Sequence, residues 1–503
     1  MTFALLSLLF IMSSFPSESL STTVPDARPP VNERRFFPSE SLSTTVPDAR
    51  PPVNDRRFRS AAVENEIVRV TTALRAVGAT DFAQLFANTF PNTLDTTVSF
   101  VDSVAFVITG DIDAMWLRDS TNQVLPYVPL ASQDPSLAHL LVSLIKRQAS
   151  FINIDPYANA LYARPDQVSP WATDATKTLS FAGTKTNVRN NMIHERKFEI
   201  DSHGSFMQLA TEYFAHTNDS APFDAHFRSA LQSVLSVLTL HAQLDTEATR
   251  GAANAPYSFQ RLTEQPSDTL QFGVGAPAKA CGLIRSAFRP SDDALVLPFN
   301  VPQNMFVATQ LKRMANVASQ LGWTTEASSA AALAASVTAA IQKFGIVRHP
   351  SGATVFAYEV DGFGNALFGD DANVPSLLSA PFLGFVAAND PVYVATRKIL
   401  LSNETNPFFF RGRAGEGIGS PHTGFGLIWP MSVVVRAFTS SDSTEIKQCL
   451  WTLLNSTAGT GLMHESFDRD DARVFTRSWF AWANTLFAHL VQHLLATNPS
   501  VFQ

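Results

Sequence analysis

The chain has 503 residues, of which 45% are hydrophobic, 11% aromatic and 16% charged, so it holds ample apolar material for a sizeable core. Its formal net charge is −7 and it has no run of Lys or Arg that could follow a phosphate backbone, which argues against a nucleic-acid partner. The chain has only two cysteines, Cys281 and Cys449, which are too few for a disulfide scaffold. They could form one disulfide or remain two free thiols.

Residues 1–14 are predicted to be a signal peptide. Residues 2–12 form an apolar run that is too short to span a bilayer, although no Lys or Arg precedes it. Asn-X-Ser/Thr sequons at Asn218, Asn403 and Asn455 agree with a secretory route. We therefore expect a secreted or secretory-pathway protein with no stable membrane span.

Residues 15–59 are predicted to form a disordered stalk. Residues 15–36 recur as residues 37–58 and differ only at Glu33 and Asp55. The repeated unit is rich in Pro, Ser and charged residues and lacks the periodic apolar face of a packed element. Two copies are too few for a solenoid, so the repeat indicates a recent tandem duplication or an artefact of gene prediction, with no part in the chemistry.

Residues 60–503 are predicted to form one all-α domain, because apolar residues recur there at spacings of three and four. One helix is expected after an N-cap at Ser202 and another near 479–490, while strand-like alternation is confined to short pieces such as 353–360. Polar motifs lie in the connections between helices, which is typical of a helical toroid with function on loops at one end. The other expected helices cover 62–76, 135–152, 223–243, 302–320, 325–344, 390–401, 424–438 and 443–455.

Six loop segments concentrate polar residues, and the most unusual is GDIDAMWLRDS, residues 110–120. Its three aspartates and one arginine surround a Met and a Trp, a combination that suits the wall of a polar cleft. No zinc motif, EF-hand loop, nucleophile elbow or P-loop occurs. A surplus of carboxylates beside Arg, His and Trp is typical of glycoside hydrolysis, in which one carboxylic acid protonates the leaving oxygen and a second carboxylate activates water or attacks.

Together these segments resemble glycoside hydrolase family 125, the exo-acting alpha-1,6-mannosidases, and especially its fungal members. The resemblance covers residues 60–497 and rests on GDIDAMWLRDS, ERKFEIDS, FRPSDDA, PQNMF, DDANVPSLL, GSPHT and HESF…FTRSWFAWAN in that order. It implies an (α/α)6 barrel that removes non-reducing terminal mannose with inversion and needs no metal or organic cofactor. The implied partners are mannose-containing oligosaccharides or glycoproteins.

By motif, Asp201 in ERKFEIDS matches the family's general acid and Glu465 in HESF matches its general base. Burial beside Phe198 would raise the pKa of Asp201, whereas the start of a helix would lower it. From the residues alone, Asp201 could instead be a helix-terminal charge, with Glu195 and Glu199 as competing acids. Glu465 alone would read as a solvated loop residue.

Seven further residues are expected to bind the sugar. Several also have structural interpretations: Arg118 and Asp119 could form an internal ion pair packed on Trp116, and His422 could be a hydrogen-bonded structural histidine. Arg196 could balance the carboxylates of the site. The seven residues are Trp116, Arg118, Asp119, Arg196, Asp292, Asp371 and His422.

His203 departs from the family pattern, because an apolar residue is expected directly after the Asp201-Ser202 pair. If His203 contacted the acid, it could alter the pKa of that acid. Trp479 and Trp482 fall on an apolar helical stripe, which favours core packing over sugar stacking. Two other functions stay open: a non-catalytic mannan- or glycan-binding protein on the same barrel, or a related toroid hydrolase for another sugar.

Overall fold

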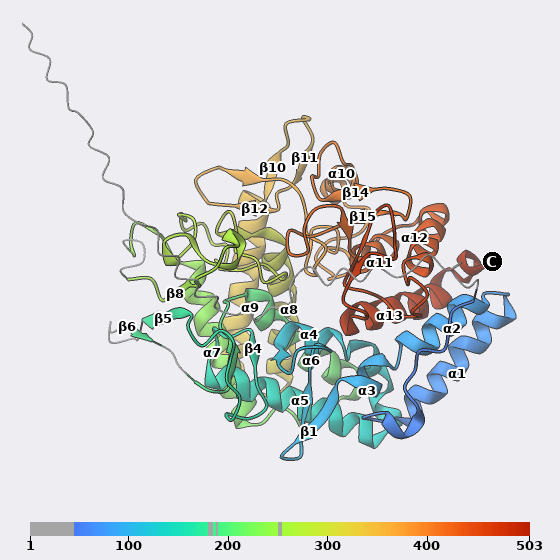
Figure 1. Ribbon diagram of the computed structural model, residues 1–503. Helices are drawn as coiled ribbons and strands as arrows, with labels where there is room; N and C mark the ends of the chain where they lie inside the picture. The colour runs from blue at the N-terminus through green and yellow to red at the C-terminus, as the bar shows by residue number, and fades with distance from the viewer. Residues whose placement is uncertain (1–44, 180–184, 188–189, 250–253) are drawn as a thin grey trace, which may run out of the picture.

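The computed structural model describes residues 45–179, 185–187, 190–249 and 254–503. The predicted signal peptide and residues 15–44 of the predicted stalk lie outside these ranges. Within them the chain is rich in helix, as expected, and its strands are short (Figure 1). The α-helices are α1 Ala61–Ala76, α2 Thr80–Thr89, α3 Asn92–Thr96, α4 Leu117–Asn122, α5 Pro135–Ile154, α6 Ile200–Thr217, α7 Ala225–Ala242, α8 Val301–Gln320, α9 Thr324–Ala340, α10 Pro391–Leu400, α11 Pro430–Phe438, α12 Ser443–Asn455 and α13 Ala481–Thr497.

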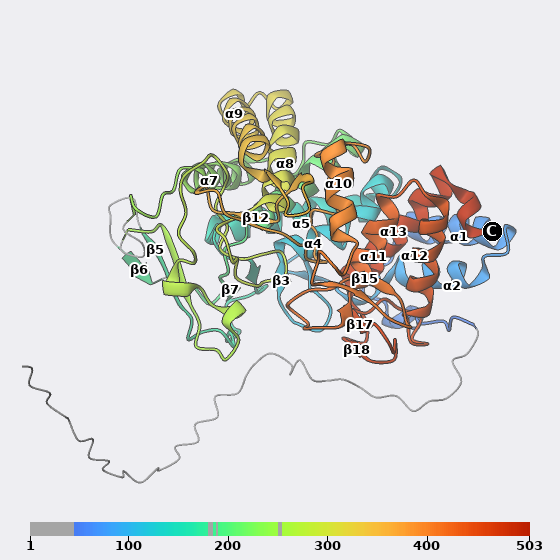
Figure 2. The ribbon, with the colours of Figure 1, turned by 90° about the horizontal axis from the view of Figure 1, so that it is seen from above.

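Helices α6, α8 and α13 lie inside the domain. All residues of 200–207, 301–308 and 481–488 are buried, so the first two turns of each helix are covered on every side. Helices α7 and α9 alternate buried and exposed residues and pack outside, with α9 lying antiparallel along α8 (Figure 2). The C-terminal helices α12 and α13 contact α2, which brings the two ends of the described chain together (Figure 1).

Small antiparallel sheets connect segments that are far apart in the sequence. In one sheet, β4 (Ala160–Leu161) pairs with both β3 (Met115–Trp116) and β7 (Ile193–Glu195). In another, β17 (Ser466–Asp468) pairs with β16 (Leu427–Ile428) and β18 (Phe475–Thr476). The remaining strands are β1 Val98–Val101, β2 Val104–Val107, β5 Ala175–Leu179, β6 Lys185–Asn187, β8 Tyr257–Gln260, β9 Phe299–Asn300, β10 Ile346–Arg348, β11 Thr354–Phe356, β12 Glu359–Val360, β13 Ala366–Leu367, β14 Phe409–Arg411 and β15 Glu416–Ile418.

The end of the predicted stalk is ordered, which corrects the prediction of disorder for residues 45–59. Arg50 extends between Glu64 and Asp95, with Nη2 2.7 Å from Glu64 Oε1 and Nε 2.9 Å from Asp95 Oδ2. Asn88 accepts a hydrogen bond from the backbone N–H of Ala49 and donates one to the carbonyl of Pro47. Periodicity could not reveal this segment, because polar side chains and backbone groups attach it instead of an apolar face.

Two predicted helix starts differ from the structure by three residues or more. Helix α6 begins at Ile200, with Glu199 rather than Ser202 as its N-cap, and the Glu199 side chain makes no capping bond because Arg118 engages it. Helix α11 begins at Pro430, six residues later than the predicted start at 424. The segment 353–360 contributes strands β11 and β12 to two different sheets.

Both cysteines are free thiols, which settles the alternative left open by the sequence; Cys449 is buried and Cys281 is half-buried. The asparagines of the three sequons are all exposed. Among the helices of the described ranges, none is both long and apolar enough to cross a membrane.

Candidate active site

A cavity of about 260 Å³ opens beside the first turns of helices α4 and α13. Arg118 and Asp119 lie in the first turn of α4 and Trp482 lies in the first turn of α13, and all three side chains line it. The short sheets complete the wall: β7 supplies Glu195, and Glu465 directly precedes β17. Because helix N-termini favour nearby negative charge, this position suits a site rich in carboxylates.

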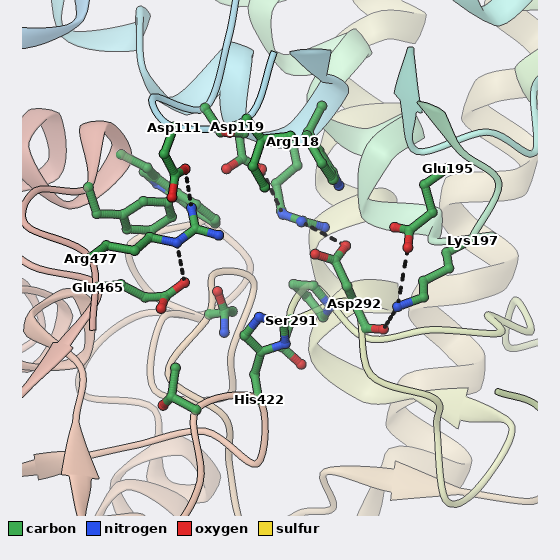
Figure 3. A pocket seen from close by; sticks show the side chains of 18 of the residues that line it. Asp111, Arg118, Asp119, Glu195, Lys197, Ser291, Asp292, His422, Glu465 and Arg477 are labelled. Carbon is green, nitrogen blue, oxygen red and sulfur yellow. Dashed lines mark hydrogen bonds and ion pairs between the residues drawn. The ribbon is translucent and has the colours of Figure 1, made fainter. Parts of the chain in front are cut away.

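Glu465 and Arg477 form one side of the cavity (Figure 3). The antiparallel register of β17 and β18 pairs Ser466 with Thr476, so the residues that flank this pair lie side by side. Arg477 Nε is 3.2 Å from Glu465 Oε1, and Arg477 Nη1 is 3.2 Å from Asp111 Oδ1. The arginine thus fixes the orientation of the Glu465 carboxylate from behind.

Arg118 organises the opposite side through ion pairs with four carboxyl groups. Its Nη1 is 2.6 Å from Glu199 Oε2 and 3.3 Å from Asp201 Oδ2. Its Nη2 is 3.3 Å from Asp292 Oδ1, and its Nε is 3.4 Å from Asp119 Oδ2. One guanidinium cannot neutralise four buried carboxylates, so protonation of part of this cluster is favoured.

The protonation equilibria of the cluster reflect that imbalance. Burial raises the pKa of Asp119 to about 6 against the opposing effect of Arg118. Burial, followed by the negative charge of Asp292, raises the pKa of Glu199 well above its ordinary range. Burial also raises the pKa of Asp201. For Asp292, burial acts in the same direction, but Arg118, the Glu199 carboxyl and Lys197 lower the pKa overall.

A strained turn holds Asp292 at the cavity wall. Its backbone lies in the left-handed region, with φ 64°, which is uncommon outside Gly but tolerated by Asp and Asn. Lys197 Nζ donates a 2.6 Å hydrogen bond to the Asp292 carbonyl, and the Asp292 N–H donates to the carbonyl of Arg289. These contacts leave the Asp292 side chain 21% exposed and directed toward the cavity (Figure 3).

Asp201 lies behind the cavity wall and does not line it. Its side chain is fully buried, and its oxygens accept hydrogen bonds from Gln303 Nε2 at 2.6 Å and Arg118 Nη1 at 3.3 Å. The sequence-based prediction that Asp201 is the general acid therefore lacks the contact with substrate that a general acid needs. Of the two competing acids, Glu199 is also fully buried, whereas Glu195 lines the cavity within a network of ion pairs. Asp292, predicted as a sugar-binding residue, reaches the cavity as well.

Several polar atoms of the wall have no hydrogen-bond partner within the part of the chain that the structure describes. They include the indole N–H groups of Trp116 and Trp482 and the Oδ2 atom of Asp119. The Trp116 ring also meets His194 edge to face, with 5.2 Å between ring centroids. A buried donor without a partner is costly, so a ligand rich in hydroxyl groups would satisfy this wall.

Within the described ranges, no group of three or more His, Cys, Asp or Glu side chains is arranged to hold a metal ion. The family model for the metal-independent alpha-mannosidases matches residues 79–492. The chain belongs to glycoside hydrolase family 125.

Two relatives of this family 125 chain cover most of its length. The meiotically up-regulated gene 157 protein of Schizosaccharomyces pombe is 42% identical over 440 residues, which are 84% of each protein. A solved structure of a metal-independent alpha-mannosidase from Streptococcus pneumoniae, in a non-productive complex with alpha-1,6-mannobiose, is 35% identical with a TM-score of 0.81. It covers 88% of this chain and 100% of its own.

The family 125 chain brings five of the seven predicted sugar-binding residues to the cavity: Trp116, Arg118, Asp119, Asp292 and His422. Arg196 and Asp371 do not line it. Arg196 pairs with Asp155, its Nε lying 2.5 Å from Oδ2, and its guanidinium lies over two tyrosine rings. Asp371 accepts hydrogen bonds from Asn373 and Ser420, and Asn373 does reach the cavity.

His203 does not contact the acids of the site. Its Nε2 lies 2.6 Å from the carbonyl oxygen of Pro156, and burial lowers its pKa to about 4, so the ring is neutral near pH 7 and donates this hydrogen bond. Trp482, expected in the core, is almost fully buried and also lines the cavity. Trp479 packs against Gly110, where a Cβ would lie 3.0 Å from the Trp479 ring and where the φ of 134° also favours glycine.

A second group of charged residues lines the cavity beyond Asp292, and sequence reasoning missed most of it. Lys197 and Arg261 share the Asp268 carboxylate, at 2.8 and 3.1 Å, and Arg261 Nη1 is 2.9 Å from Glu195 Oε1. The Arg261 guanidinium also lies 3.6 Å from the centroid of the Trp171 ring. Glu195 and Lys197 lie within ERKFEIDS, whereas no motif marked Arg261, Asp268 or Trp171, because these residues lie on separate loops that only the fold brings together.

Proposed function

We propose that this chain is an exo-acting alpha-mannosidase that hydrolyses non-reducing terminal alpha-1,6-linked mannose with inversion, on an (α/α)6 barrel. Family membership supports the sugar, and the alpha-1,6-mannobiose held by the Streptococcus pneumoniae relative supports the linkage. The inner and outer helices support the barrel. The observation that carries the proposal is that Asp292 and Glu465 face one cavity from opposite sides (Figure 3).

Asp292 replaces Asp201 in our assignment of the general acid. An acid must reach the glycosidic oxygen, and Asp292 lines the cavity whereas the Asp201 side chain is fully buried. Asp201 then acts as a buried hydrogen-bond acceptor that orients Arg118. This reassignment keeps the acid in one of the motifs that carry the resemblance, FRPSDDA.

Glu465 serves as the general base. Asp292 donates a proton to the glycosidic oxygen as the bond from that oxygen to the anomeric carbon breaks. A water molecule attacks the opposite face of the sugar and gives its proton to Glu465. The two carboxyl groups are expected to stand about 6.5–9.5 Å apart, which leaves room for this water, and the first product is beta-mannose.

Trp116, Trp482 and Asp119 hold the terminal mannose. Their unsatisfied N–H groups and carboxylate oxygen would bond to sugar hydroxyls, and the indole rings offer flat apolar faces to the pyranose. Arg118 orients Asp119 and Asp292 together, so binding and proton donation depend on the same guanidinium. The bound partners are mannose-containing oligosaccharides or glycoproteins.

One assay tests the function against its alternatives. Purified protein is incubated with alpha-1,2-, alpha-1,3- and alpha-1,6-mannobiose while proton NMR follows the anomer that forms first. We expect beta-mannose from the alpha-1,6 substrate alone. Binding without hydrolysis would favour a glycan-binding protein, release of alpha-mannose would contradict inversion, and cleavage of only another sugar would contradict the substrate.

The chain is also proposed to enter the secretory pathway. The exposed positions of Asn218, Asn403 and Asn455 support this proposal, because an acceptor asparagine must be accessible. Expression in a eukaryotic host should yield a protein whose mass falls on treatment with an N-glycan-removing amidase. An unchanged mass, with the N-terminus intact, would contradict the proposal.

A further inference from the structure

Glu199 and Asp292 are joined by shared hydrogen-bond donors. Arg118 donates from Nη1 to Glu199 Oε2 at 2.6 Å and from Nη2 to Asp292 Oδ1 at 3.3 Å. Asn159 Nδ2 lies 3.2 Å from Glu199 Oε1 and 3.3 Å from Asp292 Oδ1. Two side chains, from separate segments, thus hold the two carboxyl groups together.

Because Arg118 and Asn159 each donate to both groups, the two carboxyl groups lie close enough for a hydrogen bond between them. Ionised carboxylates only accept hydrogen bonds, so a bond between the two groups requires one proton. Glu199 is fully buried, whereas Asp292 is partly exposed to the cavity. The pair therefore has one member shielded from solvent and one member that faces the substrate.

We propose that Glu199 and Asp292 share one proton, and that Glu199 keeps this proton available to Asp292 for cleavage of the glycosidic bond. The inference rests on the proposed role of Asp292 as the general acid. Glu199 does not reach the cavity, so it acts through Asp292 as a positioning residue. Two interacting carboxyls with one proton titrate as a unit, which extends the pH range over which a proton is present.

The charges around the pair favour this arrangement. Burial and the charge of Asp292 raise the pKa of Glu199, while Arg118 and Lys197 help to lower that of Asp292. Because the Glu199 side chain is fully buried and the Asp292 side chain is 21% exposed, desolvation favours the proton on Glu199 in the free enzyme. The ionisable groups that face the pair from the surrounding elements are Arg118, Asp119, His194, Glu195, Lys197, Asp201, His422 and Arg477.

The proton moves in two steps during the reaction. It first passes from Glu199 to Asp292, which leaves a Glu199 carboxylate paired with Arg118. Asp292 then gives the proton to the glycosidic oxygen, which leaves with the electron pair of the broken bond, while Glu465 takes a proton from the attacking water. Loss of that proton to solvent and uptake of one by the Glu199–Asp292 pair restore the enzyme.

The test compares Glu199→Gln with wild type on two substrates. Gln keeps the shape of Glu but cannot release a proton, so we expect the rate on alpha-1,6-mannobiose at pH 7 to fall roughly 100-fold. The basic limb of the kcat/KM profile should move at least about one pH unit lower. Hydrolysis of 2,4-dinitrophenyl alpha-mannoside should change less than about threefold, because that leaving group needs no proton.

Asp201→Asn is the matched control. Asp201 contacts the same Arg118 nitrogen and is equally buried, but no hydrogen bond joins it to Asp292. Its basic limb should stay within about half a pH unit of wild type, because no shared proton is lost. An equal shift of the basic limb in both variants would attribute the effect to charge near Arg118 and overturn the proposal. For Glu199→Gln alone, a pH profile identical to wild type, or equal losses of rate on the two substrates, would also overturn it.

Two further variants separate the possible failures. If Asp292→Asn loses activity equally on the two substrates, Asp292 is not the general acid. If only Glu199→Gln loses activity equally on both, Asp292 remains the acid and only the shared proton is contradicted. Should Glu199→Gln fail to fold, Glu199→Asp is measured instead, since it keeps a titratable carboxyl group. Its rate on alpha-1,6-mannobiose should exceed that of Asp292→Asn, and an equal rate would contradict the proposal.

Discussion

Arg477 Nε lies 3.2 Å from Glu465 Oε1, while Nη1 of the same guanidinium lies 3.2 Å from Asp111 Oδ1. Arg477 reaches both carboxylates from a left-handed backbone position with φ 50°. The pairing connects the two ends of the domain, since Asp111 and Arg477 are 366 positions apart. Glu465 is therefore held as an oriented acceptor on the side of the cavity opposite Asp292 (Figure 3).

Replacing Glu465 with Gln should abolish hydrolysis whatever the leaving group. An amide cannot accept a proton from the attacking water, so kcat should fall by about 100- to 10,000-fold on both alpha-1,6-mannobiose and 2,4-dinitrophenyl alpha-mannoside. Steady-state rates, with mannose affinity as a control for the intact site, measure this. Retention of activity on the activated substrate would show that Glu465 is not the base.

Asp292→Asn and Asp201→Asn should behave differently. Asp292→Asn should lower kcat on alpha-1,6-mannobiose by about 100- to 10,000-fold and spare the dinitrophenyl substrate, because only the poor leaving group needs an acid. Asp201→Asn should mainly lower the free energy of unfolding, by about 1–3 kcal/mol, since the amide cannot accept from both Gln303 and Arg118. If Asp201→Asn instead lost activity on alpha-1,6-mannobiose and kept it on the dinitrophenyl substrate, Asp201 would be the general acid, as the sequence predicted.

The helix-rich class could be predicted from the sequence because each helix carries its own apolar period. The wall formed by Trp116, Arg118 and Asp119 could be located too, since these residues lie within one short segment that mixes charge with a Trp. Such local patterns depend only on neighbours in the chain. They require no knowledge of how distant segments meet.

The choice between Asp201 and Asp292 depends on contacts that no local pattern contains. Asp292 reaches the cavity because its turn is left-handed and because Lys197, 95 positions away, holds its carbonyl. Asp201 is covered because Gln303 and Arg118 converge on it from other helices. Long-range packing therefore decided which carboxylate faces the substrate.

His203 should govern stability in acid and leave the pH–rate profile unchanged. Its folded-state pKa of about 4 lies below the ordinary 6.5, so the unfolded chain takes up a proton first as the pH falls. Relative to His203→Gln, wild type should lose about 3 kcal/mol of unfolding free energy between about pH 6.5 and pH 4. Denaturant unfolding across this range measures the loss.

A constant difference between wild type and His203→Gln across that range would contradict the buried, neutral histidine. The rate profiles of wild type and His203→Leu should superimpose, because the hydrogen bond of His203 runs to Pro156 and to neither acid. A displaced profile would show that His203 influences the acid after all.

The duplicated N-terminal unit should be replaceable by its first copy. Deleting residues 37–58 joins Phe36 to Arg59 and puts Arg28 in the place of Arg50, with every contacting residue unchanged. The one substitution, Glu33 for Asp55, falls at an exposed position. We therefore expect the deletion to leave the unfolding free energy within about 0.5 kcal/mol of wild type.

Arg28→Ala tests whether the first copy of the repeat takes over the contacts of the second copy in the deletion variant. In the deletion background it should cost about 3–5 kcal/mol, because Asp95, whose side chain is 2% exposed, would lose its closest cation. In the full-length chain, where Arg50 already contacts Asp95, the same substitution should change the unfolding free energy by less than about 0.5 kcal/mol. Equal effects in the two backgrounds would mean that the first copy does not take the place of the second.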